Sequence, residues 1–178
     1  DGLDSLLRKS LVRRVEGAGH TRYAMLETVR EYADELLVAS GEAEEIRDMH
    51  ADHFVHLAEA AETRFQGPEL AQVIRTLEEE RDNLRAVLER AIAREDVERA
   101  ARLAGALGWS WWLRGHLTEG RGWLERVLAL PGSGARSALR AKLVFAAGLV
   151  AFPQRDSASA RAWLEEAASI WRELGDQW

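Results

Sequence analysis

Three histidines, His50, His53 and His56, follow one another at intervals of three residues and are the most obvious candidates for metal ligands. In a helix each step of three residues turns the side chain by about 300°, so the three imidazoles spread over about 120° of the surface. They cannot all reach one ion, and the chain has no cysteine that would complete a site. The spacing therefore predicts no metal centre here.

No other set of residues has the pattern of a catalytic centre. The absence of cysteine excludes a thiol nucleophile, and no Gly-x-x-x-x-Gly-Lys-Ser/Thr segment is present to cradle a nucleotide phosphate. A nucleophile, a base and an orienting group do not occur together, and the many Glu–Arg spacings are typical of surface ion pairs. We predict a protein that is not an enzyme and that binds no cofactor or metal itself.

Basic residues near the N-terminus could instead bind nucleic acid. Residues 1–22 contain five lysines and arginines against three acidic residues, a net charge of +2, so the remainder carries −8 when the total is −6. Arg13, Arg14 and Arg22 could contact DNA phosphates, or they could face another domain or solvent. The acidic balance of the whole chain is unfavourable for a nucleic-acid binder.

These arginines lie in a helix–hairpin–helix pattern. Leu3–Leu7 is a short apolar helix, and two strand-like segments follow, Leu11–Val15 and Thr21–Met25, joined by the glycine-containing turn Glu16–His20. Apolar residues then recur at helical spacing until Gly41. The pattern predicts the C-terminal part of a winged-helix domain over residues 1–41.

Everything after Gly41 has the pattern of helices. Residues 42–96 are predicted to form a helical linker or bundle, in which Pro68 is the first residue of a helix and Glu78–Asp82 is a solvated face or a bend. No apolar run approaches the roughly 20 residues that span a bilayer, which favours a cytoplasmic protein. Two further sets of residues are expected here: buried side chains at Ile46, Met49, Phe54 and Leu57, and helix caps at Asp96, Thr118 and Asp156 or Ser157.

An internal repeat organises residues 97–178. Arg102–Trp109 aligns with Lys142–Leu149 at an offset of forty residues, and Arg121–Glu125 aligns with Arg161–Glu165 at the same offset. Each unit is a predicted pair of antiparallel helices in which Gly108, or its equivalent in the second unit, allows a close approach between backbones.

The order of small and large residues resembles the tetratricopeptide repeat, whose period is about 34 residues. A six-residue loop at Pro131–Arg136 accounts for the longer spacing. Trp111, Trp123 and Trp163 are expected in the core, and Trp178 marks the start of a third unit. The predicted fold is mainly α: a partial winged helix with a β-hairpin, then a helical bundle and a tetratricopeptide-like α-solenoid.

The repeats predict an interaction surface on the inner, concave face of the solenoid, where such proteins generally bind peptides. Tryptophan and arginine there suit binding, because they dominate interaction hot spots. Alternatively these side chains pack against the next helix pair or the preceding bundle. The predicted partner-binding or ligand-binding residues are Arg102, Trp109, Trp112, Lys142, Phe145, Leu149 and Phe152.

Four segments carry a resemblance to a known family: Leu7–Val12, Arg22–Ala33, Glu80–Leu88 and Leu113–Glu125. They resemble the C-terminal winged-helix plus tetratricopeptide-repeat region of bacterial STAND-type transcriptional regulators, which carry an NB-ARC-like nucleotide domain and occur in actinobacteria as AfsR-like and LuxR-like proteins. The resemblance implies that the winged helix packs on the nucleotide domain of the same full-length chain, where ATP binds, outside this sequence.

The same resemblance implies that the repeats receive a protein or small-molecule effector and that this part of the chain does not contact DNA. The predicted function is therefore a non-catalytic regulatory and protein-interaction module. The alternative is a DNA-binding winged-helix module that contacts phosphates through the basic hairpin.

Overall fold

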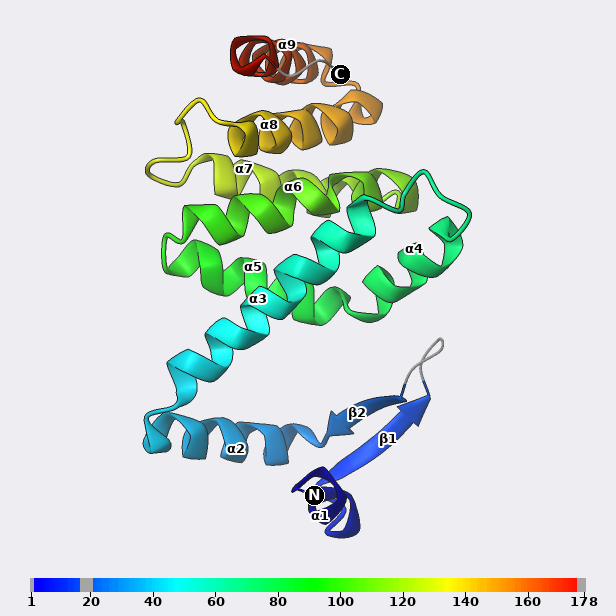
Figure 1. Ribbon diagram of the computed structural model, residues 1–178, viewed down its shortest axis with the longest axis vertical. Coiled ribbons are helices and arrows are strands. Elements are labelled where there is room, and N and C mark those ends of the chain that lie inside the picture. Colours follow the sequence, from blue (N-terminus) through cyan, green and yellow to red (C-terminus); the bar gives the residue numbers. More distant parts are fainter. Residues whose placement is uncertain (1, 17–20, 176–178) are drawn as a thin grey trace. The chain divides into compact units, whose positions relative to one another are not determined.

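The computed structural model describes residues 2–16 and 21–175, and the chain divides into two units, residues 1–50 and 51–178 (Figure 1). The described residues are mainly helical, with one antiparallel hairpin ahead of the helical part. This confirms the predicted fold class. The finer division into segments ending at residues 41 and 96 stays a prediction.

The first unit is built around the hairpin. Strand β1 (Val12–Glu16) pairs with β2 (Thr21–Met25), and helix α1 (Gly2–Arg8) packs against β1. The predicted turn at Glu16–His20 falls largely on residues 17–20, which lie outside the described residues. Helix α2 (Glu27–Ser40) follows the hairpin and ends, as predicted, at Gly41. Gly41 has a φ of +80°, a conformation that residues with a side chain rarely adopt.

Helix α3 (Ala43–Glu62) begins in the first unit and continues into the second. Of the side chains expected in its core, Phe54 is buried and Leu57 is half-buried. The prediction for Ile46 and Met49 is wrong, since both are exposed. They belong to the first unit, whose described elements do not cover them, whereas Phe54 and Leu57 pack into the core of the second unit.

The second unit is a stack of helices (Figure 1). Helix α6 (Val97–Arg114) packs against α7 (Leu117–Leu128), α8 (Ala138–Ala151) packs against α9 (Ser157–Leu174), and α6 and α7 both pack against α8. The main core extends from α3 to α8, and Trp163 of α9 packs against it. The helices that follow α3 are α4 (Leu70–Glu79), α5 (Arg81–Ala93), α6 (Val97–Arg114), α7 (Leu117–Leu128), α8 (Ala138–Ala151), the short 3-10 helix η1 (Phe152–Gln154) and α9 (Ser157–Leu174).

The close approach predicted at the repeat glycines is confirmed. A Cβ atom on Gly108 would lie 2.6 Å from Ala146 Cβ, so α6 and α8 meet closer than any side chain at this position would allow. A Cβ atom on Gly148 would lie 2.6 Å from Leu164 Cγ in α9. Trp111, expected in the core, is buried against Gly120.

The helix boundaries confirm some predicted signals and correct others. The side chains of Asp96 and Asp156 accept hydrogen bonds from the N–H groups of Arg99 and Ser159, so both cap helices as predicted. Pro68 is not the first residue of a helix, because α4 starts at Leu70 after a turn. The acidic segment around Glu80 is a bend that separates α4 from α5.

The prediction that Thr118 caps a helix is also wrong. Gly115, with a φ of +74°, ends α6, and the chain re-enters a helix at Leu117. His116 therefore takes the N-cap position of α7, without a side-chain hydrogen bond. Trp178, predicted to open a third helix pair, lies outside the described residues.

Candidate DNA-contacting hairpin and partner-binding surfaces

Strand alternation decides how the three arginines of the hairpin are arranged. Arg13 lies opposite Ala24 and Val15 lies opposite Arg22, and paired residues of an antiparallel ladder project from the same face. Arg13 and Arg22 therefore share one face as diagonal neighbours. Arg14 lies opposite Tyr23 and belongs to the other face. The hairpin thus places two of the three predicted cations on one face, the exposed Arg13 and the half-buried Arg22, and the third on the other face.

The surface of the first unit is both basic and apolar. Arg8 and Lys9, at the end of α1, are exposed and add positive charge next to the hairpin. Helix α2 has no buried residue, and Tyr32 on it is 62% exposed. The unit therefore has exposed basic side chains as well as exposed apolar surface, a combination suited to a partner.

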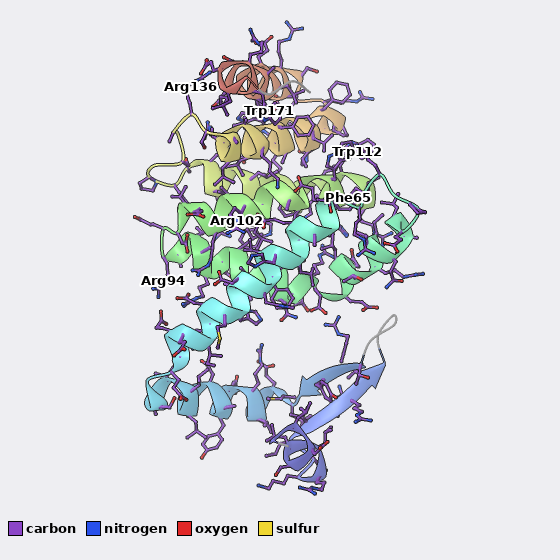
Figure 2. The ribbon with its side chains drawn as sticks, in the orientation of Figure 1. Phe65, Arg94, Arg102, Trp112, Arg136 and Trp171 are labelled. Carbon is purple, nitrogen blue, oxygen red and sulfur yellow. The ribbon has the colours of Figure 1, made fainter. Side chains whose placement is uncertain are left out.

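The polar residues predicted to bind a partner on the repeats are engaged by helix α3. Arg102 donates from Nε to Glu59 Oε1 and from Nη2 to Glu59 Oε2, each at 2.8 Å (Figure 2). Lys142 forms an ion pair with Glu62. The hydrogen bond from Arg102 lowers the pKa of Glu59, and the same bond raises the pKa of Arg102. These two cations hold α3 across α6 and α8.

The predicted aromatic residues have different environments. Trp109 and Trp112 form a T-shaped pair with ring centroids 5.5 Å apart, and Phe145 meets Trp171 of α9 at 5.7 Å. Phe145 is thus engaged in packing between helices. Trp112 and Phe152 are exposed to solvent, with exposed fractions of 39% and 69%.

The two exposed aromatic residues lie at equivalent positions of the repeat. Trp112 and Phe152 occupy the same position in the two aligned helices, at the adjacent C-terminal ends of α6 and α8, and Leu149 is half-buried one turn before Phe152. We refer to Trp109, Trp112, Leu149 and Phe152 as the aromatic stripe. Trp112 and Phe152 are its exposed members, whereas Trp109 and Leu149 are half-buried.

Charged residues that the sequence analysis did not select form a network between α4, α5 and α7. Arg85 Nε donates to Glu119 Oε1 at 2.6 Å, and Arg81 pairs with the other oxygen of Glu119. The hydrogen bond from Arg85, with a further one from Arg81, outweighs burial and lowers the pKa of Glu119 from 4.5 to about 2. His116 Nε2 lies 3.2 Å from Glu78 Oε2 at the edge of the network.

This network encloses little space. Its cavity has a volume of about 30 Å³, room for water but not for a metabolite. Glu119 is mostly buried, with 19% of its side chain exposed, and its two arginines come from α5. The arrangement fixes α7 to α5 and is structural. A signal for it existed in the charged segment Glu78–Asp82, which we interpreted as a solvated face or a bend.

The histidines have separate partners. His53 stacks edge-on against Phe54, with ring centroids 5.0 Å apart, and His56 Nδ1 lies 2.7 Å from the carbonyl oxygen of Asp52. Among the described residues, no group of three or more His, Asp or Glu side chains could hold a metal ion. Within the same residues, no helix is long and apolar enough to cross a membrane.

Comparisons with known proteins match the first unit to a domain family and the chain to part of longer relatives. Residues 1–38 match the family model of the winged helix-turn-helix domain, which places the winged helix at the N-terminal end of this chain. The chain is 39% identical over 128 residues to "Putative HTH-type transcriptional regulator Rv0890c" of Mycobacterium tuberculosis H37Rv and equally to "Putative HTH-type transcriptional regulator Mb0914c" of Mycobacterium bovis. The match covers 72% of this chain but 14% of each relative, and no solved structure matches.

Proposed function

We propose that this chain is part of a transcriptional regulator and that its winged-helix unit contacts the DNA backbone through the hairpin. The observation that carries the proposal is the winged helix-turn-helix match over residues 1–38, which includes every cation of the hairpin. The similarity to HTH-type regulators supports the same role. The proposal favours the alternative function predicted from the sequence over the expectation that this part of the chain avoids DNA.

The geometry of the hairpin selects the contact residues. Arg13 and Arg22 lie on one face and could bind phosphates of one strand together, whereas Arg14 lies on the opposite face. Lysine and arginine on phosphates position a protein on the duplex without reading its sequence. The hairpin therefore supplies attachment, and the remainder of the regulator supplies base recognition.

A salt titration tests this proposal. Two phosphate contacts predict that log K for a duplex falls with log[salt] with a slope of about −1.8. We expect R13A/R22A to weaken binding of a fluorescein-labelled 20-base-pair duplex at low salt and to bring the slope toward zero. Fluorescence anisotropy at several salt concentrations measures both.

Two single substitutions provide the controls. R14A, on the opposite face, should have a smaller effect than R13A/R22A, and R75A, at an exposed position of α4, should have none. Binding by R13A/R22A equal to that of the unmodified chain would refute the assignment, as would the absence of any salt-sensitive binding.

A second function, reception of a regulatory signal by the helical unit, is supported by the aromatic stripe. Trp112 and Phe152 are large aromatic side chains exposed at equivalent repeat positions, and tryptophan in particular is frequent in interaction hot spots. In this proposal the helix pairs are tetratricopeptide-like, the regulator is of the STAND type, ATP binds elsewhere in a cytoplasmic full-length protein, and the segment itself is not catalytic.

Replacement of the two exposed residues of the aromatic stripe tests signal reception separately from stability. Because Phe152 is exposed and Trp112 is partly exposed but paired with Trp109, W112A/F152A should lower the free energy of unfolding by about 1–2 kcal/mol at most. In the full-length regulator it should abolish the response of a promoter reporter to its inducing condition. An unchanged response in a protein of unchanged abundance would argue against partner binding at the stripe.

A further inference from the structure

Ser10 occupies an exposed turn between α1 and β1 (Figure 1). Its N–H group donates to the carbonyl oxygen of Leu7 at 3.0 Å, and the N–H group of Leu11 donates to that of Leu6 at 3.0 Å, so the two bonds close the C-terminus of α1. Ser10 has a φ of +56°, a left-handed conformation that costs a residue with a side chain about 1 kcal/mol. The turn therefore presents a hydroxyl group where the backbone alone favours glycine.

The chain around Ser10 is strongly basic. Residues 5–15 contain four cations and no acidic residue. The cations are Arg8, Lys9, Arg13 and Arg14, and all four side chains are exposed. Among the residues that the structure describes, no ion pair engages any of them. Their positive charge is therefore not neutralised, and it flanks the hydroxyl group on both sides along the chain.

Two other serines that lie close to arginine in the sequence have engaged hydroxyl groups. Ser137 is half-buried, and its Oγ accepts a hydrogen bond from the N–H group of Arg140 at 3.1 Å, which caps α8. Ser133 is buried, and its Oγ donates to the carbonyl oxygen of Leu128 at 2.7 Å. For Ser10, by contrast, the described part of the chain shows no hydrogen bond that engages the hydroxyl group. Ser10 thus combines an accessible hydroxyl group with basic neighbours.

We infer that Ser10 is a phosphorylation site for a protein kinase that selects serine among basic residues, and that its phosphate releases the hairpin from DNA. In this reaction Ser10 Oγ attacks the γ-phosphorus of ATP, and the bond from that phosphorus to the oxygen of the departing ADP breaks. The hydroxyl proton passes to a base of the kinase. An exposed turn suits such a substrate, because the kinase must bind the segment in its own cleft.

The charge of the phosphate matches the charge that it must cancel. Phosphoserine carries a charge of about −1.5 to −2 at pH 7. Residues 1–22 carry a net charge of +2, so the modification brings this segment close to neutrality. The phosphate oxygens also accept charge-assisted hydrogen bonds from guanidinium groups, in competition with DNA. The effect on DNA rests on the proposed attachment through the hairpin, whereas the modification itself does not.

Phosphoserine installed at position 10 tests the effect on DNA. The full chain is produced with phosphoserine at this position by amber suppression, and its binding to the fluorescein-labelled duplex is measured by anisotropy at several salt concentrations. We expect the affinity at low salt to fall at least about tenfold and the slope of log K against log[salt] to approach zero. S10A should bind the duplex as the unmodified chain does.

Phosphoserine at position 157 is the matched control. Ser157 is exposed in the first turn of α9, in the helical unit. A phosphate there changes the total charge by the same amount but leaves residues 1–22 at +2. The chain modified at position 157 should therefore bind DNA like the unmodified chain.

A kinase reaction tests the modification itself. The full chain is incubated with ATP and the catalytic subunit of a kinase that selects serine among basic residues, and mass spectrometry locates the phosphate. We expect it on Ser10, and R8Q/K9Q should slow its incorporation severalfold because these side chains supply half of the local positive charge.

Either experiment can overturn the inference. Phosphoserine at position 10 could leave the DNA affinity and the salt slope unchanged, or phosphoserine at position 157 could weaken binding as much. The kinase could modify other residues in place of Ser10, or incorporate as much phosphate into S10A. Absence of salt-sensitive binding by the unmodified chain would refute the DNA attachment, and the kinase reaction would still decide whether Ser10 is modified, so the two proposals can fail separately.

Discussion

Replacement of Gly108 by alanine is expected to lower the free energy of unfolding of the helical unit by about 1–2 kcal/mol. The new Cβ atom would lie 2.6 Å from Ala146 Cβ and 3.2 Å from Ala146 Cα. Neither atom can rotate away, so α6 and α8 must separate along their shared core. Overpacking of this kind costs about 1–3 kcal/mol or more, and the better helix propensity of alanine returns only about 1 kcal/mol.

Gly122→Ala is the matched control. Gly122 also lies inside a helix, but a Cβ atom there would have no other atom within 4 Å. This substitution should therefore raise the free energy of unfolding by about 0.5–1 kcal/mol. Urea denaturation followed by tryptophan fluorescence measures both variants, because all seven tryptophans lie between Trp109 and Trp178 and report on the helical unit. Equal effects of the two substitutions would show that the helices tolerate a side chain at Gly108.

The close packing at Gly108 could be predicted because it is encoded locally. A glycine in an apolar helix is costly unless a neighbour needs the space, and its recurrence forty residues later at Gly148 marks both helices as members of a repeat. Helix caps are encoded in the same way, since Asp96 and Asp156 each act on an N–H group three residues ahead. Such short-range signals need no knowledge of the rest of the fold.

The surroundings of the candidate partner surface could not be predicted in that way. The repeat phase places Arg102 and Lys142 on a common face but does not say what covers it. Their partners, Glu59 and Glu62, lie 43 and 80 residues away on α3, a helix outside the repeat.

The arrangement of the hairpin arginines could be predicted in part. Strand alternation alone separates Arg13 from Arg14, but the face on which Arg22 lies depends on the register. The register pairs Val15 with Arg22, and so brings Arg22 to the face of Arg13. The sequence therefore gives the positive charge of the hairpin but not which arginines share a face.

Substitution of Glu119 by glutamine is expected to destabilise the helical unit by about 2 kcal/mol at pH 7. The pKa of Glu119 falls from 4.5 to about 2 in the folded chain, chiefly because Arg85 donates a hydrogen bond to the charged carboxylate. At about 1.4 kcal/mol for each pKa unit the shift sets an upper limit near 3.4 kcal/mol, which solvent screening reduces. E119Q also removes the negative charge with which both Arg81 and Arg85 form ion pairs.

The destabilisation caused by E119Q should decrease as the pH is lowered. Because folding lowers the pKa of Glu119, its contribution is complete above pH 4.5 and is lost as the pH falls from there to about 2. The difference between E119Q and the unmodified chain should therefore shrink steadily as urea denaturation is repeated from pH 5 to pH 3.

E125Q provides the comparison for this result. Glu125 also accepts from an arginine, at 2.7 Å from Arg121 Nε, but its side chain is 48% exposed, and such a pair contributes less than about 0.5 kcal/mol. The two carboxylates belong to the same helix and differ in burial and in their number of arginine partners. If E119Q were no more destabilising than E125Q, or if its effect did not change with pH, Glu119 would be an ordinary surface charge, and the attachment of α7 to α5 would rest on apolar packing alone.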